Sequence, residues 1–304
     1  MAKLVDALGL GPSGATLESS SLSVRTRFML NFLHTFSPQP ILFSFGPINI
    51  YWYGFFVVSG ALLGLAITFK LAKKYGISSD KIFDLAFWII LGGIVGARIY
   101  DVFLNFSYYL KHPLQTIEIW KGGLAIHGGI IAGLIIIFIF SRKNKINFWK
   151  LTSLIAPGLA LAQSIGRWGN YFNQELFGLP TNFSWGIPIN ILNRPVDHLS
   201  NNFFHPTFLY ESIGCLVIGL ILILANFYFN HKKELGVKKY IWMTALYMIL
   251  YSLLRFGLEF IRIDKTPIFL GLRWPQIISL IIITAFITII FHPHARSEEY
   301  KKNN

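Results

Sequence analysis

A short stretch near the middle of the sequence carries a high density of polar side chains. Residues 166–178 contain one Arg, two Asn, one Gln and one Glu directly after an apolar segment. Polar groups at a membrane edge are expensive unless they bind something. We therefore expect this stretch to form one wall of a site for an anionic lipid headgroup.

A second group of polar residues recurs at helical spacing further along the chain. Tyr251, Arg255 and Glu259 follow one another in steps of four, and Arg262 comes three residues later. These steps predict one stripe on a single helix. Arg255 and Glu259 could form an ion pair that only neutralises itself. The additional Arg262 leaves a surplus positive charge, which favours a phosphate ligand.

Two further residues have alternative interpretations. His127 has glycine pairs on both sides and lies five or six residues into an expected span from 122, a depth of about 8 Å. It could be a structural hydrogen bonder, but the bare backbone beside it favours an accessible imidazole that takes up a proton. Arg98 precedes Asp101 by three residues, which fits a local ion pair as well as a role in the site.

The elements that must position these residues follow from composition. The 304-residue chain is 54% hydrophobic and 13% charged, whereas soluble chains carry about 25% charged residues. We expect an all-α integral membrane protein, because each apolar stretch is close to the length of a membrane-crossing helix. The seven predicted transmembrane helices lie at about 49–70, 82–104, 122–140, 151–166, 207–229, 240–260 and 274–291.

The loop charges predict an orientation for these helices. The first, third and fifth loops and the C-terminal segment carry 15 Lys and Arg, whereas the longer second, fourth and sixth loops carry 7. The positive-inside rule then places the N-terminus outside and the C-terminus in the cytoplasm. The net charge of +13 falls in these short clusters, where anionic lipids and topology account for it, so no nucleic-acid partner is expected.

The chain divides into three predicted parts. Residues 1–28 are polar and are expected to be a disordered extension, unless translation starts at Met29. Residues 29–294 form a single transmembrane domain, and residues 295–304 a charged cytoplasmic tail. The single Cys215 excludes an intrachain disulfide and a cysteine metal site. No metal and no cofactor are expected.

Glycines at four-residue spacing occur in three of the expected helices: Gly60 and Gly64, Gly92 and Gly96, Gly129 and Gly133. Small residues let helix backbones approach closely where lipid gives no hydrophobic driving force. These glycines predict close helix packing and indicate no catalytic or binding role. Tyr51 and Trp52 fit an aromatic belt at the membrane surface.

Taken together, these residues resemble one family, the bacterial phosphatidylglycerol:prolipoprotein diacylglyceryl transferases. The stretch from Gly166 to Gly178 matches the family pattern Gly-Arg-x-Gly-Asn-x-x-Asn-x-Glu-x-x-Gly without a gap. Further matches are His-Gly-Gly, His-Pro-Thr and Arg-Phe-x-x-Glu-Phe-x-Arg, which begin at His127, His205 and Arg255. The resemblance covers residues 49–292.

The resemblance implies an activity and a location. Members of this family move the diacylglyceryl group of phosphatidylglycerol onto the thiol of the lipobox cysteine in prolipoprotein signal peptides. The products are a thioether and glycerol 1-phosphate, and the reaction is the first step of lipoprotein maturation. The chain is accordingly expected in the bacterial inner membrane among membrane lipids, with its site towards the outer leaflet.

Roles follow from the resemblance and from charge. Arg167 and Arg255 are expected to bind the headgroup phosphate, with Glu259 holding Arg255. His127 is the candidate base, although the arginines could instead lower the thiol pKa by their field alone. The expected substrate-binding residues are Tyr53, Arg167, Asn170, Asn173, Glu175, Gly178, Tyr251 and Arg262.

Two other classes of protein use polar groups inside membranes. A transporter or channel for an anionic solute would show paired discontinuous helices in repeated halves, and the sequence has no internal repeat. An intramembrane protease would need a Ser or paired Asp within the spans, whereas these residues lie mostly in loops or at span ends. Both classes are disfavoured.

Overall fold

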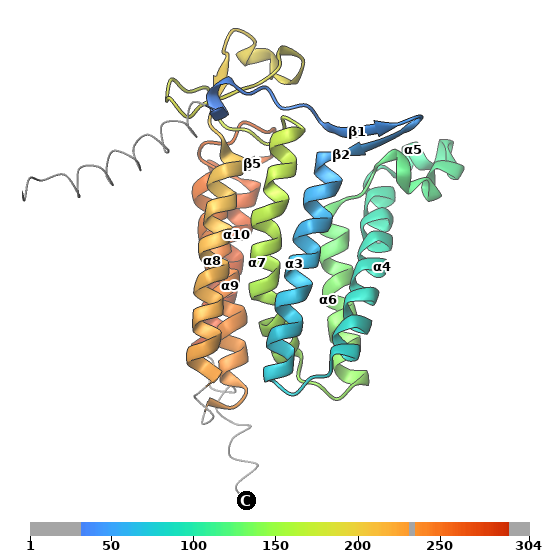
Figure 1. Cartoon of the computed structure of the whole chain (residues 1–304), viewed down its shortest axis with the longest axis vertical. Helices are drawn as coiled ribbons and strands as arrows, with labels where there is room; N and C mark the ends of the chain where they lie inside the picture. The colour runs from blue at the N-terminus through green and yellow to red at the C-terminus, as the bar shows by residue number, and fades with distance from the viewer. Residues whose placement is uncertain (1–31, 231–234, 292–304) are drawn as a thin grey trace, which may run out of the picture.

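Each apolar stretch expected from the sequence is a long helix in the computed structural model, which describes residues 32–230 and 235–291. The helices run side by side in one bundle (Figure 1). They are α3 (Trp52–Lys74), α4 (Ser79–Leu104), α6 (Ile126–Lys143), α7 (Phe148–Phe172), α8 (Thr207–Asn230), α9 (Lys238–Leu258) and α10 (Trp274–Phe291). The expected extension 1–28 and tail 295–304 lie outside the described residues.

Within the described residues, six helices are long and apolar enough to cross a membrane: α3, α4, α6, α8, α9 and α10. The class of helical, multi-pass membrane protein is therefore confirmed. α7 is 25 residues long but less apolar, because it packs against α3, α8 and α9 and can carry small and polar side chains there. Its crossing, and the side on which each terminus lies, stay predictions.

Short elements cover the ends of the long helices. Antiparallel pairs join β1 (Ile41–Phe45) to β2 (Ile48–Tyr51), β3 (Ile187–Pro188) to β4 (Phe203–Phe204), and β5 (Ile268–Phe269) to β6 (Leu272–Arg273). Short helices are α5 (Phe106–Lys111), η2 (Pro113–Ile117), η3 (Ile119–Lys121), η4 (Ile191–Asn193) and η5 (Val196–His198).

The start of the first span was predicted too early. Residues 48–51 pair with 41–45 as a hairpin, and α3 begins only at Trp52. In the register of the hairpin, Phe45 lies opposite Ile48 across the turn at Gly46, which has a φ of +58°. A left-handed residue of this kind favours a tight turn over a helix.

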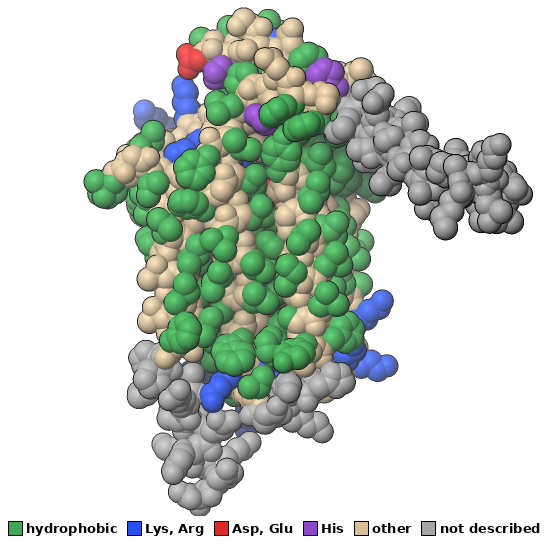
Figure 2. Space-filling model, turned by 90° about the vertical axis from the view of Figure 1, so that its left-hand side faces the viewer, with side chains coloured by type: hydrophobic (Ala, Val, Ile, Leu, Met, Phe, Trp, Pro, Cys, Tyr) green, Lys and Arg blue, Asp and Glu red, His purple; other side chains and the backbone are tan. Residues whose placement is uncertain are grey.

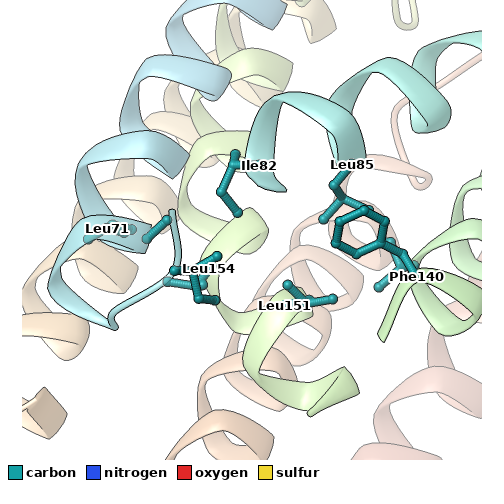
Figure 3. Packing of buried hydrophobic residues seen from close by; sticks show 9 residues of the cluster. Leu71, Ile82, Leu85, Phe140, Leu151 and Leu154 are labelled. Atoms are coloured by element: carbon teal, nitrogen blue, oxygen red, sulfur yellow. The ribbon is translucent and has the colours of Figure 1, made fainter. Parts of the chain in front are cut away.

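Four helices meet in an apolar cluster at the lower end of the bundle (Figure 3). Its members come from α3, α4, α6 and α7, and include Leu71, Ile82, Leu85, Phe140, Leu151 and Leu154, all buried. Close packing of such side chains adds many small dispersion contacts. The cluster fixes the turns that join these helices at this end.

Two helix pairs approach each other closely through small residues. A Cβ on Gly60 would lie 2.7 Å from the Ala162 carbonyl oxygen, and one on Gly64 would lie 2.8 Å from that of Gly158. These contacts confirm the expected glycine packing of α3, here against α7. Gly96 packs in the same way on Gly128. α7 is thereby held against α3, with its C-terminal end among the loops at the upper end of the bundle (Figure 1).

Candidate active site at the upper end of the bundle

The polar stretch begins inside α7 and not behind it. The span was expected to end at 166, but the helix continues to Phe172. Aromatic packing extends it, because the Phe172 ring stacks on Trp52 and the Tyr171 ring on Phe208, each pair with centroids 4.6 Å apart. Arg167 therefore stands on a rigid helix and not on a loop.

Three separate segments meet on the buried carboxylate of Glu211, in α8. Arg167 Nη2 lies 2.7 Å from Glu211 Oε1, and the Tyr251 hydroxyl of α9 donates to the same oxygen at 3.1 Å. Arg262 Nη1 lies 3.8 Å from the other carboxylate oxygen. Because Glu211 is only 1% exposed, these partners replace the water that its charge would otherwise need.

A second buried carboxylate, Glu259, pairs with two further arginines. Arg255 Nη2 is 2.9 Å from Glu259 Oε2, and Arg273 Nε is 3.0 Å from Glu259 Oε1. Arg255 follows Tyr251 on α9 by about one helical turn, or about 5.4 Å of rise. The two carboxylate centres are thus linked through Tyr251 and the α9 backbone. We call the residues Arg167, Arg255, Arg262, Arg273, Glu211, Glu259 and Asp264 the arginine group.

Arg262 does not lie on the stripe that its spacing predicted. α9 ends at Leu258, and Glu259 is its C-cap residue. The chain then pairs with a distant segment: Arg262 forms a β-bridge with Gly178, and the Leu179 amide donates to the Ile261 carbonyl at 2.7 Å. A non-local backbone contact, and not helical periodicity, brings Arg262 to Glu211.

Only glycine fits at position 178, because the chain there lies very close to the segment that carries Ile261 and Arg262. A Cβ at this position would lie 2.7 Å from the Ile261 carbonyl oxygen and 2.9 Å from both His205 Cβ and Thr207 Cγ2. The Gly178 amide also donates to the His205 carbonyl at 2.9 Å.

The His205 ring is partly buried, and this burial lowers the pKa of its imidazole. His205 is therefore neutral at pH 7.

The amides of the polar stretch brace an exposed carboxylate. Asn170 Nδ2 donates to Glu175 Oε1 at 2.7 Å, and Asn173 Nδ2 donates to the same oxygen at 3.4 Å. Arg167 Nη1 in turn donates to Asn170 Oδ1 at 3.3 Å. These contacts connect Glu175 to the arginine group through neutral amides.

Tyr53 and His127 lie at the same end but are placed differently. Tyr53 packs on α7, where a Cβ on Gly169 would lie 2.9 Å from Tyr53 Cδ2. His127 lies in the first turn of α6, because this helix begins at Ile126 and not at 122. Its ring is exposed, with the Tyr100 ring centroid 6.1 Å away. Among the described residues, no hydrogen bond or ion pair joins His127 to the arginine group.

Arg98 organises the loop that precedes His127. Its guanidinium donates to the carbonyls of Thr116 at 2.9 Å, Gly122 at 2.7 Å and Gly123 at 2.8 Å. Its ion pair with Asp101 is longer, at 3.8 Å. The buried Arg98 therefore serves chiefly as a loop clamp.

The arginines divide into two kinds by their contacts rather than by exposure, because the Arg273 side chain is 18% exposed, close to that of Arg255. The side chains of Arg167 and Arg255 are 24% and 21% exposed, whereas that of Arg262 is 5% exposed and pairs with Asp264 at 2.7 Å. Arg273 donates to the carbonyls of Arg262 and Asp264. The first two arginines can meet a ligand, while Arg262 and Arg273 hold the backbone and carboxylates behind them.

Three members of this group were not among the residues expected from the sequence: Glu211, Asp264 and Arg273. A signal for Glu211 was present, because it is the only acidic residue in the span 207–229 and buried arginines need carboxylate partners. Arg273 follows a sharp turn that local spacing does not indicate. Among the described residues, no group of three His, Cys, Asp or Glu side chains could hold a metal ion.

Comparison with known proteins adds an independent finding. The family model described as prolipoprotein diacylglyceryl transferase matches residues 40–292. The phosphatidylglycerol–prolipoprotein diacylglyceryl transferase of Nostoc sp. is 44% identical over 83% of this chain and 87% of its own length. The proteins of that name from Trichormus variabilis and Synechocystis sp. are 44% and 41% identical, over 84% and 81% of this chain and 89% and 86% of their own lengths.

Proposed function

The chain belongs to the prolipoprotein diacylglyceryl transferase family, and on this premise we propose how its arginine group performs the transfer. The protein is a transferase that acts in the first step of lipoprotein maturation. Its lipid substrate is phosphatidylglycerol, and its acceptor is the lipobox cysteine of a prolipoprotein signal peptide. Arg167 and Arg255 bind the headgroup phosphate.

The observation that carries this proposal is the convergence on Glu211. Arg167 and Tyr251 meet on one oxygen of this buried carboxylate, and Arg255 stands one turn further along α9. The two partly exposed guanidinium groups come from different helices and are linked through Tyr251, which meets Arg167 on Glu211 and precedes Arg255 by one helical turn. Guanidinium groups bind phosphate oxygens in a planar, often bidentate arrangement. Two such groups on helices hold a phosphate more firmly than a single arginine on a flexible loop would.

The charge of the group supports a phosphate ligand. Its four arginines face three carboxylates, Glu211, Glu259 and Asp264, so one positive charge is left over. A phosphodiester carries one negative charge. In addition, Arg167 Nε is buried with no hydrogen-bond partner among the described residues. A headgroup oxygen or a water molecule would satisfy this donor.

The reaction requires a leaving group and a nucleophile. The cysteine sulfur forms a bond to the glycerol carbon, and the bond from that carbon to the phosphate oxygen breaks. The phosphate takes the electron pair and leaves as glycerol 1-phosphate, gaining negative charge as it does so. Arginines held in advance by buried carboxylates stabilise this charge without rearranging. The thiol proton goes to a base, because the thiolate is the nucleophile.

The remaining residues take supporting roles in this proposal. Glu259 holds Arg255, and Arg262 holds Glu211 from behind. Asn170, Asn173 and Glu175 bind the glycerol hydroxyls or brace the loop, while Tyr53 lines the site on α3. Gly178 permits the joint to Arg262. His127 is the candidate base, and an alternative is that the field of the arginines alone lowers the thiol pKa.

A topology accompanies this function. We propose that α7 is a seventh crossing, with the N-terminus outside and the C-terminus in the cytoplasm. In Figure 1 the described chain starts at the upper end and α10 finishes at the lower end, which fits an odd number of crossings. The positive-inside rule then places the arginine group at the outer leaflet of a bacterial inner membrane.

A reconstituted assay tests the function. The purified protein is incubated with phosphatidylglycerol and a lipobox peptide, and we expect release of glycerol phosphate with a matching gain in peptide mass. A peptide with serine in place of the lipobox cysteine is the control and should gain no mass. Glycerol phosphate release that did not depend on the cysteine would contradict the proposal.

A further inference from the structure

A polar cavity lies at the end of the bundle opposite to the arginine group. It has a volume of about 460 Å³ and opens between the turn from α3 to α4 and the turn from α6 to α7. Three of its lining residues are Lys81, Lys145 and Lys150. We call it the lysine cavity. Figure 2 shows Lys and Arg side chains at this lower end, below a band of hydrophobic surface.

The lysines of this cavity lack carboxylate partners at ion-pair distance among the described residues, although Asp84 follows Lys81 by about one turn of α4. In residues 32–230 and 235–291, none of the three lysines takes part in an ion pair. Lys150 is partly buried, and its Nζ donates to the Tyr75 carbonyl at 2.8 Å, which fixes it at the cavity wall. A concave site with three unpaired ammonium groups attracts anions.

The backbone adds to the same potential. The N-cap residues of α4 and α7, Ser78 and Asn147, both line the cavity. Ser78 makes no side-chain capping bond, so first-turn amides of α4 are left without that partner. The N-terminal end of a helix carries partial positive charge and suits a phosphate. Asp80 lies in the first turn of α4 but does not line the cavity.

Apolar surface adjoins the cavity on two sides. Its inner wall includes Ile77 and Ile146, which pack in the cluster with Leu71. On α4, the exposed Trp88 lies about two turns from Lys81 on the same face of the helix, and it lines a groove with Ile136 and Ile139 of α6. A ligand with a charged head and an apolar tail could therefore place its phosphate among the lysines and its chain along the helices.

We propose that the lysine cavity binds the phosphate of an anionic lipid from the leaflet opposite to the arginine group. This site is separate from the proposed transfer site and does not depend on the transfer reaction. It would hold one lipid at the turns that connect α3 to α4 and α6 to α7. A free inorganic phosphate offers the same chemistry without the tail, so the test must distinguish the two.

The test counts lipids bound to the intact protein. Dioleoyl phosphatidic acid is titrated into the full-length protein in neutral detergent micelles, and bound lipids are counted by native mass spectrometry. The variant Lys81→Gln/Lys145→Gln should lose one bound lipid. We expect about 30-fold weaker binding at this site, because each lysine near an anionic headgroup contributes about a factor of five. The single variant Lys81→Gln should show about a fivefold loss on the same grounds.

The matched control is Lys70→Gln/Lys73→Gln, which removes the same charge from the end of α3 outside the cavity. It should keep the lipid. An equal loss in both double variants would overturn the proposal, because bulk charge would then explain the binding. Displacement of the lipid by equimolar inorganic phosphate would also overturn it, since the site would then recognise phosphate without the tail.

Discussion

The two ends of the helix bundle carry positive charge in different ways. At the upper end, five ion pairs join the four arginines of the arginine group to three carboxylates, of which Glu259 is fully buried and Glu211 almost fully buried. At the lower end, the lysines of the lysine cavity have no such partners among the described residues, and only Lys150 is held, by a carbonyl.

The difference fits the two proposals, which give catalysis to the arginine group and headgroup binding to the lysine cavity. Charges that must stabilise a transition state need fixed positions before the reaction starts, and buried carboxylates supply that order. Charges that only collect a headgroup can stay on flexible stems in water. Arginine with its planar fork suits the first task, and lysine as a mobile point charge suits the second.

The largest expected effect is on turnover at the arginine end. Arg255→Ala should lower the rate of diacylglyceryl transfer by roughly 100- to 1,000-fold, as removal of one donor to a developing charge does in other enzymes. Glycerol phosphate release measures it, with folding checked by size-exclusion chromatography. The control Lys265→Ala removes an exposed cation from the segment after Arg262 and should change the rate little. If Arg255→Ala kept normal turnover, the phosphate clamp would be refuted.

The next effect concerns stability. Glu211→Gln leaves the guanidinium groups of Arg167 and Arg262 without their shared negative charge, so we expect the free energy of unfolding to fall by about 3 kcal/mol. Thermal unfolding in detergent measures the change. Glu175→Gln alters an exposed carboxylate held only by amides and is the matched control. Equal stability of the two variants would show that the arginine end is no more ordered than the lysine end.

A third test concerns His127 as the base. His127→Gln should lower turnover by about 100-fold at neutral pH, the lower range for loss of a general base. The pH–rate profile should change as well, because the variant has no base at this position. An unchanged profile would contradict His127 as the base. The arginines would then promote loss of the thiol proton through their electrostatic field alone.

The smallest expected effect concerns the backbone bridge between Gly178 and Arg262. Gly178→Ala places a methyl group 2.7 Å from the Ile261 carbonyl oxygen, so the free energy of unfolding should fall by about 1–3 kcal/mol. Gly166→Ala is the matched control, because a Cβ there meets no atom within 4 Å. The control should be neutral or slightly stabilising, since alanine favours a helix. If both variants behaved alike, close approach at Gly178 would not be what positions Arg262.

Sequence reasoning succeeded where structure is local. Long apolar runs predicted the position of every long helix, with ends within four residues except at the C-terminal end of α7. Four-residue glycine spacing predicted the close packing of α3. The Arg255–Glu259 ion pair followed from helical periodicity in the same way. These features depend on neighbours along the chain, which a sequence displays directly.

Contacts between distant segments were not predictable in this way. Polar residues after 166 suggested a helix end, but rings packed on Tyr171 and Phe172 carry α7 further. Arg262 was placed on a stripe, although a bridge to Gly178 decides its position. Glu211 was not among the expected site residues, because its importance comes from partners on other helices.

The bridge between Gly178 and Arg262 has one more consequence. It is made of main-chain groups, together with the Leu179 amide and the Ile261 carbonyl, and substitutions elsewhere cannot delete those groups. The segment 180–203 leaves this bridge and returns beside it, where the Gly178 amide donates to the His205 carbonyl. Side-chain substitutions within that segment therefore do not remove the main-chain contacts that position Arg262.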